Sequence, residues 1–572
     1  MTAAEQVAVC ADRLLALNVA WDPFLASAVG IPEAAPLVPD DSPEAVERLR
    51  AGYVEVGAAL AAIPVEELGF SDRLTVRMAQ WHAELWPRIL DSRREEYTVS
   101  RYKAWSLPTA MNSVMPKTLI QTAAEADAYL ERCGALPAAL AGAVDGLRRG
   151  LSSGRTPVRR LVEGVLTLVD GIEGRGGPEA TLGAVRIDPS FREDPAWRER
   201  LADVTGGPVR AALGEMRRML EEEALPHARS DERPGMGWIP DGEAAYAASV
   251  AEHTTTALTP DEVHDLGLRV VAELADEGRA LAAGAFGDGD LDAAITRLRD
   301  DPSLRFTRSE DILAAARAAF ERGQEILPGF IGRLPETACE VHPMPAVEAA
   351  QMMQAYYRPG DLATGKPGVF WVNTDLGRGP TRYELETLAA HESVPGHHVQ
   401  WSMAREVRQS RYRNLTPTTA FIEGWALYCE RNAAGLGLFT DELSQLGMWS
   451  SQSWRAARLV VDTGLHAKGW SRRRAVEYLM ANTATTLENA EGEVDRYIGN
   501  PGQALAYMTG LLELRRARAD AEKRLGTAFD QRGFHDRLLA QGSPPLSLVP
   551  LIVDEWEAEV RADPAVRPDP SA

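Results

Sequence analysis

Apolar residues recur every three to four positions along most of this 572-residue chain, which is the spacing of one face of an α-helix. Thr259-Pro260-Asp261-Glu262 has the sequence of a capping box, which marks the start of one such helix. The pattern therefore predicts an all-α, mostly helical fold. Helices are predicted over residues 43–63, 71–91, 121–149, 195–224, 259–284, 307–325, 381–394, 416–433, 441–467, 471–485 and 502–524.

The segments between these helices are rich in Pro, Gly and Asp, but none is long or biased enough to be a flexible linker. The chain shows no internal repeat. We therefore expect one continuous unit with two lobes around a deep cleft. Residues 1–330 would form an N-terminal helical lobe and residues 331–572 a C-terminal lobe, with a disordered Pro-rich tail from about residue 561.

One short segment departs from the helical pattern. Phe370-Trp371-Val372 is β-prone, and Asn373 punctuates its end. It predicts a small β-hairpin or an edge strand. An edge strand could hold an extended peptide by main-chain hydrogen bonds, which makes Trp371 and Asn373 candidate substrate-binding residues. An ordinary hairpin is the competing interpretation.

Composition narrows the possible partners. The chain has 61 basic and 83 acidic residues, and its net charge of −22 argues against nucleic acid and anionic membrane. No apolar run reaches the roughly 18 residues of a membrane-spanning helix. The N-terminus lacks the basic region of a signal peptide. Four separated cysteines suit a reducing compartment, so we expect a cytoplasmic protein; the sequence leaves its oligomeric state open.

The strongest chemical signal is His391-Glu392-Ser393-Val394-Pro395-Gly396-His397-His398, which holds three of the ten histidines. Imidazoles beside a glutamate are typical of zinc hydrolases, in which nitrogens bind the metal and a carboxylate acts as base. The metalloprotease motif H-E-x-x-H separates its histidines by four positions. Here the second histidine follows the first by six positions or by seven.

Neither spacing closes on one metal ion along a straight helix. Seven residues turn about 700°, which keeps His398 on the face of His391, but they rise about 10.5 Å along the axis. Pro395 cannot donate to the carbonyl of His391, and Gly396 tolerates unusual dihedral angles. We therefore predict a local bulge between Val394 and His397 that returns His397 to the face of His391. His398 stays the alternative ligand.

A third ligand is expected from the next helix, which begins near Thr416. Glu423 lies among apolar residues, where an unpaired carboxylate would be costly. Glu430, two turns later on the same face, is the competing candidate. The sequence thus predicts one Zn²⁺ ion bound by His391, His397 and Glu423. A solvated histidine cluster and an ion-paired glutamate are the structural alternatives.

Several segments together resemble the bacterial family of domain of unknown function number 885. They are Tyr-Glu-Leu-Glu-Thr at 383–387 before the histidines, Glu-Gly-Trp-Ala-Leu-Tyr at 423–428, Gly-Val-Phe-Trp-Val-Asn-Thr at 368–374 and Pro-Gly-Gln-Ala-Leu-Ala-Tyr at 501–507. The His-His-Glu layout is similar to that of all-α gluzincins such as angiotensin-converting enzyme and thimet oligopeptidase. The resemblance implies a mostly helical, zinc-peptidase-like enzyme with a two-lobed, zincin-like architecture. The Pro-Gly insertion departs from the plain H-E-x-x-H spacing of those enzymes.

The resemblance also implies roles for further residues. Glu392 follows the first histidine, as the general base does in zincins. Tyr507 and His466 are candidates for the donor to a tetrahedral oxyanion, since the all-α peptidases similarly use a Tyr and a His from a late helix. Packed core side chains are the competing interpretation of both. Arg515 and Arg516 could pair with a substrate carboxylate, although a solvated helix face explains them better.

We expect a zinc-dependent hydrolase that acts on a small peptide or a related amide. Two alternatives keep the metal site. One is a lyase or biosynthetic enzyme acting on a small amide or amino-acid conjugate, and the other is a non-catalytic binding protein. Product analysis separates hydrolysis from the first alternative, because hydrolysis incorporates oxygen from solvent water.

Overall fold

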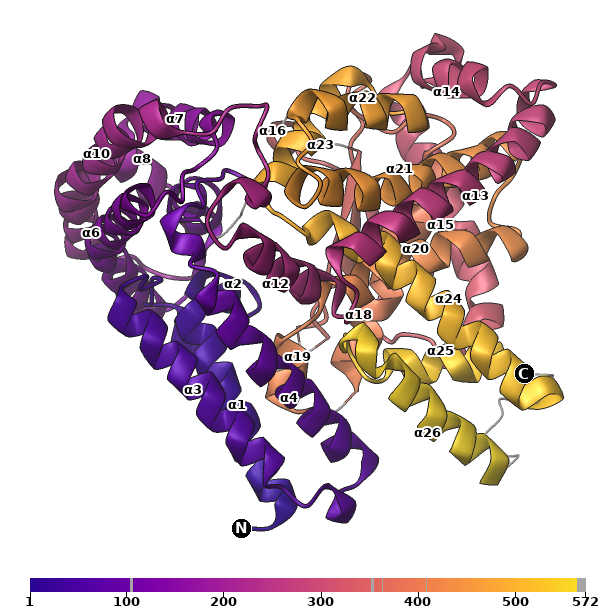
Figure 1. Cartoon of the computed structure of the whole chain (residues 1–572), viewed down its shortest axis with the longest axis horizontal. Coiled ribbons are helices and arrows are strands. Elements are labelled where there is room, and N and C mark those ends of the chain that lie inside the picture. The colour runs from indigo at the N-terminus through magenta and orange to yellow at the C-terminus, as the bar shows by residue number, and fades with distance from the viewer. Residues whose placement is uncertain (103–105, 351–353, 363, 408, 563–572) are drawn as a thin grey trace. The chain divides into compact units, whose positions relative to one another are not determined.

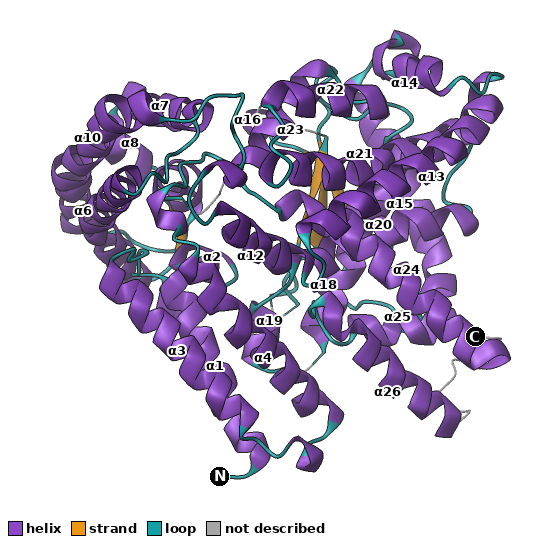
Figure 2. Ribbon diagram, viewed as in Figure 1, coloured by secondary structure: helices purple, strands orange, loops and turns teal. Residues whose placement is uncertain are grey.

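The computed structural model describes residues 1–102, 106–350, 354–362, 364–407 and 409–562. Helices form nearly all of its regular structure and the strands are short, which confirms the predicted mostly helical character (Figures 1 and 2). The chain divides into two compact units. Unit 1 comprises residues 1–249, 464–475 and 491–501, and unit 2 comprises residues 250–463, 476–490 and 502–572.

Unit 1 is helical and contains a large apolar core. The core gathers around α6, whose buried face includes Cys133, Leu136 and Leu140. Thr122 and Glu125 form a capping box at the start of this helix. The helices that lie wholly in unit 1 are α1 (Ala3–Trp21), α2 (Pro23–Ala28), α3 (Pro43–Ala61), α4 (Phe70–Asp91), α5 (Leu107–Thr109), α6 (Ala123–Ser152), α7 (Arg159–Gly174), α8 (Gly177–Gly183), α9 (Pro195–Val204), α10 (Arg210–Arg218) and α11 (Leu225–His227). Strands β1 (Leu119–Ile120) and β2 (Arg186–Ile187) pair in parallel.

Unit 2 contains the histidine motif. Its helices are α13 (Pro260–Phe286), α14 (Leu291–Asp300), α15 (Ser309–Phe330), α16 (Ala346–Ala349), α17 (Leu385–Glu392), α18 (His397–Glu406), α19 (Arg411–Leu415), α20 (Thr419–Gly435), α24 (Ala506–Leu525), α25 (Gln531–Leu539) and α26 (Val549–Ala562). The unit boundaries fall within α12 (Gly242–Thr254), α21 (Glu442–His466), α22 (Arg472–Asn482) and α23 (Leu487–Gly499). Over the described residues, no helix combines the length and apolarity needed to cross a membrane.

A three-stranded sheet accompanies the helices of unit 2. Its strand order is β3 (Cys339–Pro343), β5 (Gly368–Val372), β4 (Ala355–Arg358). β4 and β5 run antiparallel, which confirms the predicted hairpin, and β3 pairs with β5 in parallel. The alternative of an edge strand at β5 is wrong, because β5 is the central strand and both of its sides are paired. Within this sheet, β3 and β4 are the edge strands, and β4 is the first strand of the hairpin.

The division between the units lies near residue 249 rather than at the expected residue 330. The reason is packing that helical periodicity does not reveal. The indole of Trp449 on α21 donates to the carbonyl of Leu274 on α13, and any side chain at Gly267 would press on Leu459 of α21. Residues 250–330 therefore belong with the C-terminal part. The predicted arrangement of lobes around a cleft stays a prediction, and residues 563–572 of the tail lie outside the described ones.

Candidate metal centre

The histidine motif folds as the end of one helix, a tight turn and the start of another. α17 ends at Glu392 and α18 begins at His397, with a cis peptide bond between Val394 and Pro395. The predicted continuous helix over residues 381–394 with a bulge is therefore wrong in this detail. Ser393 leaves the helical region at φ −113° and ψ −103°, and Pro395 has no N–H with which to continue the helix.

Gly396 allows this turn to fold back on the end of α17. A Cβ atom at this position would collide with the carbonyl oxygens of Ala390 and His391. The close approach brings the imidazoles of His391 and His397 together, with ring centroids 4.8 Å apart and planes at 84°. The return of His397 to the side of His391 is thus achieved by a helix break.

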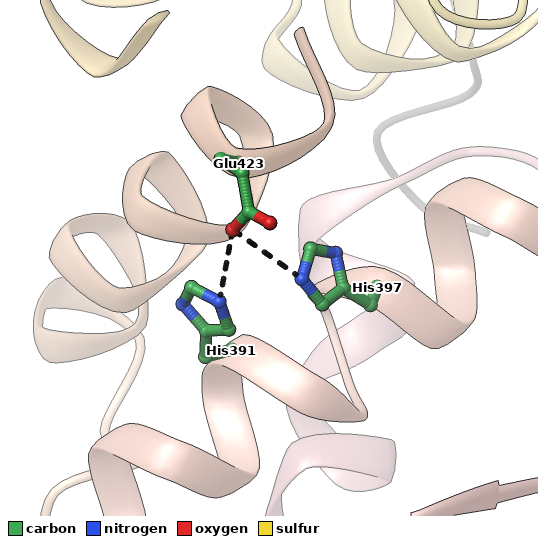
Figure 3. Close-up of side chains that lie close together, drawn as sticks. All are labelled: His391, His397 and Glu423. Carbon is green, nitrogen blue, oxygen red and sulfur yellow. Dashed lines mark ion pairs between the residues drawn. The ribbon is translucent and has the colours of Figure 1, made fainter. Parts of the chain in front are cut away.

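Glu423 on α20 completes a group of three potential metal ligands (Figure 3). Its Oε2 atom lies 3.5 Å from Nε2 of His391 and 3.7 Å from Nε2 of His397. One ligand atom from each residue lies within 4.8 Å of the other two. His398, the alternative ligand, is outside this group, and its Nδ1 lies 3.0 Å from the hydroxyl of Tyr357.

Glu430, the competing ligand candidate, contacts the other side of His391. Its Oε1 atom lies 2.7 Å from Nδ1 of the imidazole, and the residue is 1% exposed. The hydroxyl of Ser451 donates to the second oxygen of Glu430, at 2.9 Å, and Arg455 donates to that hydroxyl. Metal-bound histidines commonly donate their remaining N–H to a carboxylate, which fixes the tautomer and the ring orientation. Glu430 is therefore placed to orient His391.

The helix that carries Glu423 packs closely on the helix that carries Tyr507. Gly424 on α20 meets Gly510 on α24, where a Cβ atom on either glycine would collide with the main chain of the other helix. Tyr507 lies one turn before Gly510, at the start of α24. This glycine crossing fixes the two helices at a separation that no larger residue permits.

Burial and pairing set the protonation of the cluster. Burial alone lowers the pKa of His391, but hydrogen bonds to Glu423 and Glu430 outweigh it and raise the pKa to about 10. Burial alone raises the pKa of Glu423, but His391 and His397 lower it to about 2. Burial lowers the pKa of His397 to about 4 and raises that of Glu392 to about 7. The directions of these shifts favour positive charge on His391 and negative charge on Glu423.

The three residues open on a pocket of about 450 Å³ in unit 2. Glu392 and Tyr507, both predicted from the sequence, also contribute to its wall. Arg455 and Arg458 on α21 also line the pocket and were not predicted. Arg458 lies in the apolar run Ala-Ala-Arg-Leu-Val-Val at 456–461, which is a signal that could have identified it. The lining comprises Tyr356, Tyr357, His391, Glu392, His397, Trp401, Thr419, Ile422, Glu423, Arg455, Arg458 and Tyr507.

The remaining candidate residues lie outside this lining. His466 is buried in unit 1, where its Nδ1 accepts from the backbone N–H of Met236 and its Nε2 donates to the carbonyl of Tyr497. Both ring nitrogens are thus engaged by the main chain. Of the two oxyanion candidates, Tyr507 is the one at the pocket.

The proposed substrate-binding residues also have structural partners. Trp371 packs against Tyr356, with ring centroids 6.4 Å apart. Asn373 is fully buried, and its amide donates to the carbonyl of Ala349. Arg516 pairs with Glu513 on the same helix, as expected of a solvated face, and Arg515 contributes to a separate pocket.

Comparison with known proteins gives a family and a fold. The sequence profile of the family described as "Bacterial protein of unknown function (DUF885)" matches residues 23–552. No curated protein matches the chain. A "putative lipoprotein" from Colwellia psychrerythraea is similar in structure, with a TM-score of 0.85 and 23% identity over 98% of this chain and 100% of that chain. A "putative lipoprotein of unknown function" from Shewanella oneidensis has a TM-score of 0.74 and 17% identity, over 96% of this chain and 99% of that chain. At these identities the similarity shows a shared fold.

Proposed function

The chain belongs to the bacterial DUF885 family, and we propose that it is a zinc-dependent hydrolase of peptide or related amide bonds. One observation carries the proposal: His391, His397 and Glu423 direct two imidazole nitrogens and a carboxylate oxygen toward one another at the wall of a pocket. Two histidines and one carboxylate, with a fourth position left open, are a ligand set of catalytic zinc.

The residues fit a zinc ion in chemistry and in spacing. Two ligands of a tetrahedral zinc ion with bonds of about 2.0–2.1 Å lie roughly 3.4 Å apart. The separations of 3.5 and 3.7 Å between Glu423 and the two imidazoles are close to this value. The buried contact between Glu430 and His391 supplies the outer partner that such histidines usually have.

A bound zinc ion would supply Lewis acidity and lower the pKa of a water molecule. Side chains of the protein would transfer the protons and stabilise the oxyanion. Glu392 is next to His391 and on the pocket wall, and it would take a proton from the attacking water and pass it to the leaving amine. Tyr507 would donate a hydrogen bond to the developing oxyanion. Hydrolysis breaks the C–N bond, places the water oxygen on the acyl carbon and needs no further co-reactant.

The strand β4 supports a peptide-like substrate. Tyr356 and Tyr357 of this strand contribute to the pocket wall, and β4 lies at the edge of its sheet. An edge strand offers main-chain groups to which an extended peptide can hydrogen-bond. This role replaces the one expected for Trp371 and Asn373 on and after the central strand.

Elemental analysis and product analysis test the proposal. We expect about one zinc ion per chain, and its loss in His391→Ala, His397→Ala and Glu423→Ala. His398→Ala is the matched control, because its ring contacts Tyr357 instead of the cluster, and it should keep the metal.

A peptide library digested in ¹⁸O-labelled water should give products that carry the label, and Glu392→Gln should keep the metal but lose about 10²–10⁴-fold in turnover. Products without the label would replace hydrolysis by a lyase or biosynthetic reaction. A metal-loaded protein that converts no library member would favour a binding protein.

A further inference from the structure

Two arginines on α21 give the pocket a positive wall. Arg455 and Arg458 are three residues apart, so their side chains leave the helix on the same face. Both contribute to the pocket that contains His391 and Glu423. The whole chain carries a net charge of −22, so two guanidinium groups at this one position oppose the charge of the molecule.

Arg458 is a buried and permanently charged group. It is 4% exposed, and its guanidinium carbon lies 4.3 Å from the ring centroid of Trp454 and 4.6 Å from that of Tyr507. Contacts with two aromatic faces hold the planar group in one orientation. Arginine stays protonated in proteins, so this positive charge persists at every pH at which the protein is folded.

Arg455 interacts electrostatically with the carboxylates of Glu392 and Glu423. Its charge adds to the effect of the histidines in lowering the pKa of Glu423, and it offsets part of the rise that burial causes in the pKa of Glu392. Its Nη1 donates to the carbonyl and the hydroxyl of Ser451, at 3.2 and 2.7 Å. Among the described residues it forms no salt bridge with a carboxylate. Its fork of donors therefore keeps capacity for a planar anion in the pocket.

The volume of the pocket limits the size of the molecule that can carry this anion. A volume of about 450 Å³ is in the range of small-molecule sites, which hold a few residues at most. A free carboxylate is the anion that every peptide carries at its end and that every N-acyl amino acid carries next to its amide. Arginine binds carboxylates through two parallel hydrogen bonds.

We propose that Arg455 and Arg458 bind a free carboxylate on the amine side of the scissile amide, so that the substrates are C-terminal peptide bonds or N-acyl amino acids. This inference rests on the proposed amide-hydrolase function. The two arginines hold the carboxylate, and this contact positions the neighbouring amide carbonyl at the cluster of His391, His397 and Glu423. Substrates whose terminal carboxylate is capped as an amide lose that contact.

Binding of a matched pair of ligands tests the carboxylate contact without turnover. N-acetyl-leucine and N-acetyl-leucinamide differ in the terminal group alone, and calorimetry can compare them on metal-free protein and on the zinc-loaded Glu392→Gln variant, which should bind them without turnover. We expect the carboxylate to bind at least tenfold more tightly in both forms, with a preference that shrinks at high salt. Equal affinities in the wild-type protein would overturn the proposal.

Variants assign the preference to the two arginines. Arg455→Gln, at a partly exposed site, should reduce the preference about tenfold. The comparison is made on metal-free protein, because Arg455 also donates to the Ser451 hydroxyl that holds Glu430 against His391. Arg458→Lys keeps the charge but not the fork, and should weaken carboxylate binding to a smaller extent. Arg516→Gln, on the solvated face of α24, is the control and should change neither affinity. A preference that survives in both Arg455→Gln and Arg458→Lys would assign carboxylate binding elsewhere and contradict the proposal.

Turnover of two substrate sets then separates this inference from the function on which it rests. One substrate is a pentapeptide, from which release of the C-terminal residue is measured. The other is the N-acyl derivative of that same residue alone. The faster reaction shows whether the natural substrates are peptides or N-acyl amino acids. Equal cleavage of peptides that end in a free carboxylate and of peptides that end in an amide would support the hydrolase function and contradict carboxylate recognition. Selective binding of the carboxylate ligand without cleavage of any substrate would support the carboxylate site and contradict the hydrolase function.

Discussion

Glu430 and His391, 39 positions apart in the sequence, meet in the protein interior with Oε1 of the carboxylate 2.7 Å from Nδ1 of the imidazole. This contact leaves Nε2 of His391 directed toward Glu423 and His397. A buried carboxylate in this position fixes which nitrogen faces the candidate metal position, and it does so before any metal binds.

Replacing Glu430 by alanine should weaken zinc binding by about 10–100-fold, because His391 loses the partner that orients its ring. Glu430→Gln retains an acceptor oxygen and should weaken zinc binding less. Competition with a chromophoric chelator measures both affinities. Glu557→Ala is a suitable control, since Glu557 is also buried and paired, with Arg524, but lies outside the pocket lining. An unchanged zinc affinity in Glu430→Ala would show that the ring needs no such support.

Tyr507→Phe should lower kcat by about 10²–10³-fold, with little change in KM or zinc content, because an oxyanion donor acts in the transition state. The ring over which Arg458 lies is kept in this variant, so the packing of the pocket wall should survive. Steady-state kinetics and a melting curve are the two measurements. Full kcat together with a lower melting temperature would make Tyr507 a packing residue.

Gly396→Ala should separate the two histidines. Its Cβ atom cannot fit between the carbonyl oxygens of Ala390 and His391, so the turn must move away from the end of α17. We expect a loss of about 1–3 kcal/mol in the free energy of unfolding and a marked loss of zinc affinity. Gly329→Ala on α15, where a Cβ atom meets no neighbour, should be neutral or slightly stabilising. Wild-type metal binding by Gly396→Ala would mean that the turn relaxes without moving His397.

The stability of the protein should fall in acid because of histidines that are buried in the neutral form. Burial lowers the pKa of His535 to about 3. Its Nδ1 donates to the carbonyl of Phe330, so its Nε2 accepts from the hydroxyl of Tyr428. The folded pKa is below the unfolded value of about 6.5, so the unfolded state takes up the proton first. The stabilisation is therefore complete above pH 6.5 and is lost as the pH falls from 6.5 toward 3.

Urea unfolding of wild type and His535→Gln at pH 7.5, 6.5 and 5.5 measures this effect. The variant should be less stable at pH 7.5, and the difference should shrink by about 1.4 kcal/mol per pH unit below 6.5. A difference that stays constant over this range would contradict neutral burial of His535.

The sequence predicted those parts of the site that depend on local chemistry. Pro395 and Gly396 indicated that the helix could not continue undisturbed, and His397 does lie beside His391. The apolar neighbours of Glu423 indicated a buried carboxylate with a partner. The helix break itself was not predicted, because a proline removes a hydrogen bond without specifying the path that the chain then takes.

Other features depend on which helices pack together, and a single sequence carries little of that information. The contact of Glu430 with His391 requires α17 to lie on α20, and the position of Arg455 and Arg458 requires α21 to border the same pocket. The unit boundary near residue 249 has the same origin, because α13 finds its partner in α21 nearly 200 residues later. Periodicity located α13 and α21 correctly but could not pair them.

The crossing of α20 and α24 at Gly424 and Gly510 has a practical consequence for protein engineering. Main chain meets main chain at this point, so the two glycines set how closely the helices that carry Glu423 and Tyr507 approach each other. A directed-evolution library can therefore randomise Thr419 and Ile422, which line the pocket on α20, with little risk to the geometry of the centre. The two glycines should be held constant in every such library.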